Sequence, residues 1–291
     1  MTKLYQDIYY TAPDSLTLYA RDYDGKKGKP DLLCLHGLTR NSADFHQLAI
    51  HLGDRFRVVS VDQRGRGNSD YDTDPQNYRP DVYCADMFAL IAHLKLENPV
   101  VIGTSMGGIM TMIMSAMRPG LFRAAILNDI GPEIDPAGIK RIKGYVGGSS
   151  IFETWDDAAQ AMKAQGPDVF PLYTDEDWMA FARRTFKALP DGRPAYNYDP
   201  EIARPFKTDA ASAAPPVMWP FFEALKPIPV LSIRGGLSDL LSPATVDKMQ
   251  TGHPDFSKVE VPDVGHAPML DEPAAITAID SFLNTLAERT S

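Results

Sequence analysis

The sequence predicts an α/β fold: a mostly parallel central sheet with an antiparallel hairpin at the N-terminus and an inserted helical cap. Three observations predict this architecture. The chain starts with two alternating segments, continues with apolar runs separated by segments of helical periodicity, and contains one long stretch without a clear strand. Strands that are buried on both faces have continuous apolar sequences, and in a parallel sheet they alternate with helices.

The hairpin is predicted at 5–11 and 16–24, where apolar and polar residues alternate on either side of Ala-Pro-Asp-Ser. Six continuous apolar runs then predict buried strands at 31–36, 56–62, 98–104, 123–129, 228–234 and 257–263. Periodic segments predict helices at 42–52, 79–96, 105–117, 243–251 and 271–288.

The stretch from 132 to 226 interrupts this alternation. It contains 14 of the 28 aromatic residues of the chain, including all three tryptophans. Within it, 177–189 has the spacing of an amphipathic helix. We therefore expect a helical cap at 132–226 on a core formed by 1–131 and 227–291.

Composition limits the classes of partner. The chain of 291 residues is 44% hydrophobic and 23% charged, which is typical of a globular protein, and its net charge of −9 includes no basic cluster. Nucleic acid and anionic membranes are therefore disfavoured as partners. No secretory leader or membrane-spanning run is evident, and Cys34 and Cys84 lie in apolar patterns without a CxxC partner. We expect a cytoplasmic protein with reduced cysteines, acting as a monomer or homodimer on a small molecule.

A serine between glycines marks the end of the third predicted parallel strand. Gly103-Thr104-Ser105-Met106-Gly107 has the form G-x-S-x-G and lies between a predicted strand and a predicted helix. In that context a tight turn raises the serine hydroxyl above the sheet, and small neighbours let strand and helix approach each other. A helix-capping role is the ordinary alternative for such a serine. The strand–turn–helix context favours a nucleophile.

With this motif the sequence resembles the α/β-hydrolase fold family, from the first hairpin to the last helix. The segment Cys34-Leu35-His36-Gly37-Leu38 is similar to the family's His-Gly turn, and 62–70 is similar to its structural loop after the next strand. The resemblance implies that backbone N–H groups of Leu38 and Met106 form an oxyanion hole. It assigns His36 to packing and hydrogen bonding.

The same resemblance identifies His266, in the Gly-His turn after the last predicted strand, as the general base. Serine is a poor nucleophile at neutral pH, so an imidazole must accept its proton. Two aspartates compete as the acid that orients this histidine. Asp239, after the strand at 228–234, matches the family's usual position and is favoured. Asp129, at the end of the preceding strand, is the alternative.

Other chemistries find no motif. There is no HExxH sequence, no calcium-loop pattern and no G-x-G-x-x-G, so we expect neither a metal nor a dinucleotide cofactor. Serine at the nucleophile position also disfavours the dehalogenases and epoxide hydrolases of this fold, which use aspartate there.

The expected activity is hydrolysis of carboxylic esters or lactones of small to medium apolar or aryl compounds through an acyl-enzyme. Alternatives are a C–C bond hydrolase of ring-cleavage diketones and a ligand receptor with negligible turnover. The residues expected to contact substrate are Arg40, just beyond the oxyanion turn, and the cap tryptophans Trp155, Trp178 and Trp219.

Overall fold

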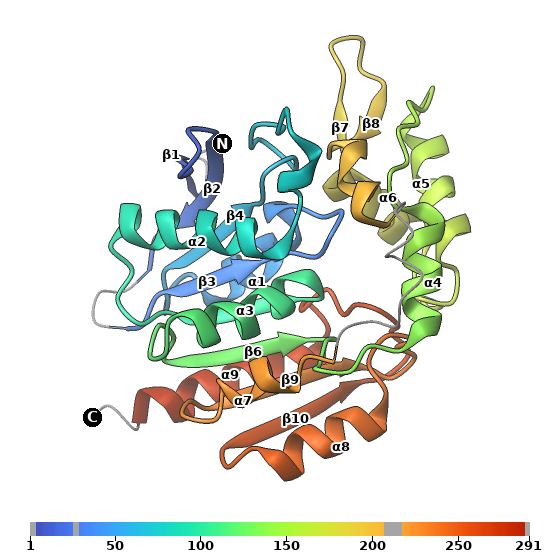
Figure 1. The fold of residues 1–291 in the computed structure, drawn as a ribbon. Helices are drawn as coiled ribbons and strands as arrows, with labels where there is room; N and C mark the ends of the chain where they lie inside the picture. The colour runs from blue at the N-terminus through green and yellow to red at the C-terminus, as the bar shows by residue number, and fades with distance from the viewer. Residues whose placement is uncertain (1–3, 26–28, 207–216, 289–291) are drawn as a thin grey trace.

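The computed structural model describes residues 4–25, 29–206 and 217–288, and it confirms the predicted α/β architecture (Figure 1). Eight strands form one sheet in the order β1-β2-β4-β3-β5-β6-β9-β10. The pairs β1–β2 and β2–β4 are antiparallel, and the remaining pairs are parallel. The strands are β1 (Gln6–Thr11), β2 (Thr17–Tyr23), β3 (Leu32–Leu35), β4 (Val58–Asp62), β5 (Val100–Thr104), β6 (Ala124–Asn128), β9 (Val230–Gly235) and β10 (Phe256–Val261).

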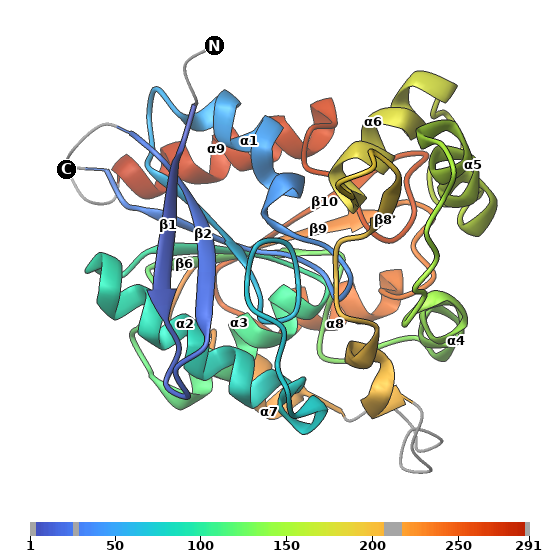
Figure 2. The same ribbon diagram turned by 90° about the horizontal axis from the view of Figure 1, so that it is seen from above.

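Helices cover both faces of the sheet, as Figure 2 shows: α1 and α9 lie on one face, and α2 and α3 on the other. Strands β3 to β6 are buried at every position except Thr104, which explains their continuous apolar sequences. The predicted helix at 42–52 begins as a 3-10 turn at Ser42–Phe45. The helices that correspond to the predicted segments are α1 (His46–Leu52), α2 (Pro80–Leu94), α3 (Met106–Met117), α8 (Pro243–Gly252) and α9 (Pro273–Glu288).

The chain between β6 and β9 is an insertion at one end of the sheet, seen in yellow and green beside α4 in Figure 1. That residues 132–226 form a separate cap stays a prediction. Residues 207–216 of this range lie outside the described residues. Its elements are α4 (Pro136–Tyr145), α5 (Trp155–Gln165), α6 (Asp175–Thr185), β7 (Phe186–Ala188), β8 (Pro194–Tyr196), the 3-10 segment Pro200–Phe206 and α7 (Trp219–Glu223). A further 3-10 turn, Pro75–Asn77, lies after β4.

The predicted helix at 177–189 is wrong at both ends. Its start moves to Asp175, where Thr174 and Asp177 form a reciprocal capping box. Its end moves to Thr185, because Phe186–Ala188 pairs with β8 across a turn that contains Gly192 at φ 87°. Pairing with β8 satisfies backbone hydrogen-bonding groups of Phe186–Ala188 that a longer helix would have paired internally. The helical periodicity of the sequence therefore predicted the wrong boundary.

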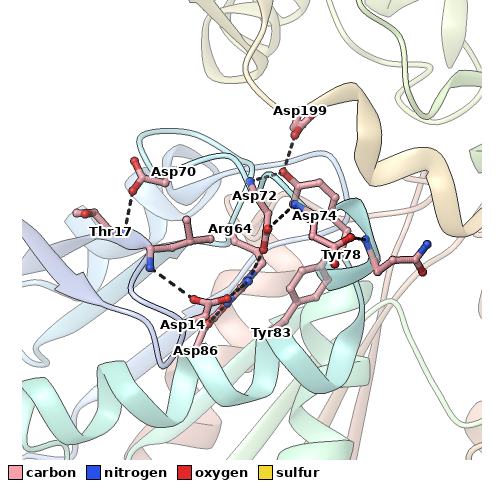
Figure 3. Close-up of polar contacts among 12 residues, drawn as sticks. Asp14, Thr17, Arg64, Asp70, Asp72, Asp74, Tyr78, Tyr83, Asp86 and Asp199 are labelled. Carbon is pink, nitrogen blue, oxygen red and sulfur yellow. Dashed lines mark hydrogen bonds and ion pairs between the residues drawn. The ribbon is translucent and has the colours of Figure 1, made fainter.

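A buried cation organises the loop after β4 (Figure 3). The Arg64 side chain is 1% exposed and donates to both oxygens of Asp86, at 2.6 and 2.7 Å. Its Nη1 also lies 2.6 Å from carboxylate oxygens of Asp14 and Asp72. The cluster joins the hairpin, the loop and α2, and it leaves the buried Asp86 carboxylate paired rather than isolated.

Arg64→Met is expected to lower the free energy of unfolding by about 3–5 kcal/mol, because it leaves buried carboxylates without their cation. Urea unfolding followed by circular dichroism measures the change. Arg79→Met is the matched control, since Arg79 and its partner Asp81 are each 59% exposed and such a pair contributes at most about 1 kcal/mol. Equal effects of the two substitutions would show that the cluster is not a stabilising element.

Candidate active site

Ser105 lies on a strained turn between β5 and α3. Its φ of 52° and ψ of −114° are an unusual backbone conformation for a residue with a side chain. The Ser105 N–H donates to the Asn128 carbonyl on β6 at 3.0 Å, which anchors the turn to the sheet. No side-chain cap hydrogen bond is made by Ser105, so the hydroxyl is not used to start the helix.

The two glycines of the motif are required by close backbone approach. A Cβ at Gly103 would lie 2.5 Å from the Gly107 carbonyl oxygen, and one at Gly107 would lie 2.1 Å from the Leu35 carbonyl oxygen. Both separations are far shorter than van der Waals contact. The start of α3 can therefore rest against β3 and β5 only because these positions lack side chains.

Ser105, His266 and Asp129 form a continuous hydrogen-bonded chain. His266 Nε2 lies 2.9 Å from Ser105 Oγ, and Nδ1 lies 2.7 Å from Asp129 Oδ2. An imidazole with an acceptor on one nitrogen can take a hydroxyl proton on the other and return it to a leaving group. The arrangement has the geometry that nucleophilic acyl transfer requires.

The aspartate that is hydrogen-bonded to His266 is Asp129 and not Asp239, which the sequence favoured. Asp239 does not contact His266 by hydrogen bond; it is paired with Arg141 on α4, at 2.6 and 2.8 Å. This pairing lowers the pKa of the Asp239 carboxyl below its ordinary value. Asp129, the alternative, is fully buried and lies beneath the imidazole instead. Both aspartates follow neighbouring strands, so their order along the chain could not separate them.

Two polar residues that no sequence motif indicated, Ser238 and Asn128, support the hydrogen bonds between Asp129, His266 and Ser105. Ser238 donates to Asp129 Oδ2 at 2.6 Å, and the Gly235 N–H donates to Oδ1 at 2.8 Å. Asn128 donates to the Pro268 carbonyl at 2.8 Å and so ties the histidine loop to β6. The available signal was position: Asn128 precedes Asp129, and Ser238 precedes the aspartate that sequence analysis favoured.

Gly37, which precedes Leu38, and Met106 both adjoin Ser105. A Cβ at Gly37 would be 3.7 Å from the Ser105 Cβ, so the turn that carries Leu38 packs directly on the serine. Met106 is the first residue of α3, where helix N–H groups lack intrahelical acceptors. Its side chain is buried in the core, which leaves only its backbone to face the serine.

Two buried residues support the Leu38 turn. Arg66, which is 0% exposed, donates to the Leu38 carbonyl at 2.9 Å and to the Tyr83 hydroxyl at 3.0 Å. His36 accepts from the Gln63 N–H at 3.0 Å, and burial lowers the pKa of His36 to about 3. His36 is therefore a neutral structural residue, as the sequence indicated.

A cavity of about 140 Å³ opens above Ser105 and His266. Trp178 and Arg40, two of the residues expected to contact substrate, line it together with the aromatic side chains of Phe170 and Phe181. The ring centroids of Trp178 and Phe181 are 5.9 Å apart, in an edge-to-face arrangement. Most of this wall is apolar.

The other two tryptophans that were expected to contact substrate do not line this cavity. The Trp155 ring stacks against the Arg183 guanidinium, 3.8 Å from its centroid. The Trp219 indole donates to Glu133 at 2.8 Å and packs on Phe222. Both are half-buried, so aromatic enrichment identified the inserted segment but not which of its rings face the serine.

Among the residues described, no helix is long and apolar enough to cross a membrane. The same residues contain no cluster of three or more histidine, cysteine or acidic side chains arranged to hold a metal ion.

Comparison with known proteins identifies the class. Residues 32–279 match the model of the alpha/beta hydrolase family, and the chain belongs to that family. It is 37% identical to the 3-hydroxybutyrate-oligomer hydrolase of Cupriavidus necator, over 86% of this chain and 87% of that protein. It is 30% identical to the 2-(acetamidomethylene)succinate hydrolase of Mesorhizobium japonicum, over 86% and 85% of the two chains.

A crystal structure supports the same assignment. An alpha/beta hydrolase from Novosphingobium aromaticivorans superposes with a TM-score of 0.92 at 44% identity, over 98% of this chain and 99% of that one. Two curated relatives of lower identity are named a probable esterase and a 3-oxoadipate enol-lactonase.

The two aspartates can be ranked by mutation. Asp129→Asn is expected to lower kcat for ester hydrolysis on the order of ten-thousandfold, because an amide at this position favours the wrong imidazole tautomer. Asp239→Asn is expected to lower it less than about tenfold, since its direct hydrogen bonds go to Arg141. Steady-state hydrolysis of p-nitrophenyl butyrate provides the measurement. A larger loss in Asp239→Asn would return the orienting role to Asp239.

Proposed function

We propose that this hydrolase cleaves carboxylic esters or lactones through an acyl-enzyme on Ser105. The observation that carries the proposal is the hydrogen-bonded chain from Ser105 through His266 to Asp129. In this mechanism His266 removes the hydroxyl proton while Ser105 attacks the carbonyl carbon. The protonated imidazole then donates to the leaving alcohol, and the buried Asp129 carboxylate stabilises its positive charge.

The backbone N–H groups of Leu38 and Met106 are the proposed oxyanion hole. Their contribution arises at the tetrahedral intermediate, where the carbonyl oxygen becomes negative. The support for this role is the packing of Gly37 on Ser105 and the position of Met106 at the start of α3. Water then enters in place of the alcohol, and His266 accepts a proton from it as its oxygen attacks the acyl carbon. His266 returns this proton to Ser105 Oγ when the bond to the acyl group breaks and the acid leaves.

Two relatives are named for compounds that contain short acyl groups. One is named for oligomers of 3-hydroxybutyrate, whose units are joined by ester bonds, and another for 2-(acetamidomethylene)succinate. A cavity of about 140 Å³ with a largely apolar wall fits short acyl chains. We therefore propose small esters as substrates, with α4 to α6 acting as the cap over the bound acyl group.

Ser105→Ala is expected to reduce turnover of p-nitrophenyl butyrate by at least about a thousandfold while the protein remains folded. A serine-reactive phosphonate should label the wild-type protein at Ser105 and leave the variant unlabelled, as peptide mass spectrometry would show. Ser115→Ala is the control, because the Ser115 hydroxyl only donates to the Thr111 carbonyl within α3.

Labelling of another residue would contradict the proposed nucleophile. A single stoichiometric burst without further turnover on any ester would instead favour a receptor on this scaffold.

The cap predicts a selective effect on acyl length. Trp178→Leu is expected to lower kcat/KM for hexanoate esters by about tenfold or more relative to acetate, because a longer acyl chain buries more apolar surface against the lost indole. Trp219→Leu is the matched control, since Trp219 does not line the cavity. The ratio of the two kcat/KM values removes any common effect on folding. An unchanged ratio in Trp178→Leu would refute a role of this ring in acyl binding.

A further inference from the structure

The cavity contains a polar corner formed by α4. Arg141 and Tyr145 are four residues apart on this helix, so their side chains lie on the same face, and both line the cavity. Both side chains are partly buried. Most of the remaining lining is apolar, including the aromatic side chains of Phe170, Trp178 and Phe181, which weakens the screening of a charge in the cavity.

Arg141 has a second edge available for a carboxylate. A guanidinium presents two edges that can each donate two parallel hydrogen bonds. Asp239 occupies the edge formed by Nε and Nη2, at 2.6 and 2.8 Å. The edge formed by Nη1 and Nη2 is not used by Asp239. The Arg141 side chain remains 26% exposed, at the margin of the cavity.

Arg40, the other arginine that lines the cavity, is arranged differently. Its Nε and Nη2 donate to Asp44, and its Nη1 donates to the Thr185 hydroxyl, so protein groups engage both edges. The guanidinium also stacks 4.2 Å from the Phe181 ring centroid. Arg40 thus joins the oxyanion turn to α6 and has less capacity to bind substrate.

We infer that Arg141, with Tyr145 on the same face of α4, binds a carboxylate carried by the substrate, so that the preferred esters are acidic ones. This inference rests on the proposed ester hydrolysis at Ser105. Asp239 is then a positioning residue: its bidentate contact holds the guanidinium in one orientation, with the remaining edge toward the cavity. An arginine suits this task because its planar donors match the two oxygens of a carboxylate.

Two pairs of esters test the inference. Within each pair, one ester carries a carboxylate and the other carries a neutral carboxamide of similar size. Ethyl hydrogen glutarate and ethyl glutaramate place a carboxylate or an amide on the acyl side of the ester. The compounds 3-acetoxypropanoate and 3-acetoxypropanamide place the same groups on the alcohol side. The wild-type protein should prefer the acid over the amide in at least one pair, and that pair identifies the side on which the carboxylate binds.

In Arg141→Gln, kcat/KM for the preferred acid should fall about 10- to 100-fold, mainly through KM, and change less than about threefold for its amide. Arg141→Lys should recover part of the loss, because it keeps the positive charge. Lys140→Gln, an exposed neighbour on α4 outside the cavity, controls for the change in net charge and should leave both values unchanged.

Equal losses on acid and amide, or no preference for either acid in the wild-type protein, would overturn the carboxylate site. A separate measurement tests the proposed function: cleavage of the ester bond in the neutral, amide-bearing probes must disappear in Ser105→Ala. If neutral esters are cleaved at Ser105 without discrimination by charge, the activity stands and only the role of Arg141 is refuted.

Discussion

The close approach of β3, β5 and the start of α3 is the constraint on which the site depends. Gly103 and Gly107 let three backbone segments meet at distances that exclude any side chain. This contact forces Ser105 into its strained conformation and presents its hydroxyl to His266, 2.9 Å away. The strain persists because the adjoining strands β3 and β5 are buried except at Thr104 and are tightly packed.

Buried arginines connect the same site to the opposite half of the sheet. Arg66 holds the Leu38 carbonyl, and the neighbouring Arg64 gathers carboxylates from the hairpin, the loop and α2. Each guanidinium is surrounded by acceptors, so the cost of burying its charge is offset by several hydrogen bonds. The loop at 62–70 therefore stabilises the fold and also positions the backbone proposed to stabilise the oxyanion.

Asp129 and Asp239 follow neighbouring strands, but their surroundings differ, and only Asp129 is hydrogen-bonded to His266. Asp129 is fully buried and receives hydrogen bonds from Gly235 and Ser238, which direct one oxygen to His266. Asp239 is partly exposed, and an arginine from the inserted segment satisfies it. The carboxylate that hydrogen-bonds to His266 is the one held by the Gly235 N–H and the Ser238 hydroxyl, and it follows β6 rather than β9.

The sequence by itself determined the α/β fold, the positions along the chain of the turns that follow the strands, and the candidates Ser105 and His266, because local periodicity and short turn motifs encode them. It favoured Asp239 over Asp129, whereas Asp129 is the aspartate hydrogen-bonded to His266, and it did not separate Trp178 from the other two tryptophans. Those choices depend on side-chain directions and on contacts between segments about a hundred residues apart, such as Ser238 with Asp129. Only tertiary packing brings such groups together, so only the structure could decide them.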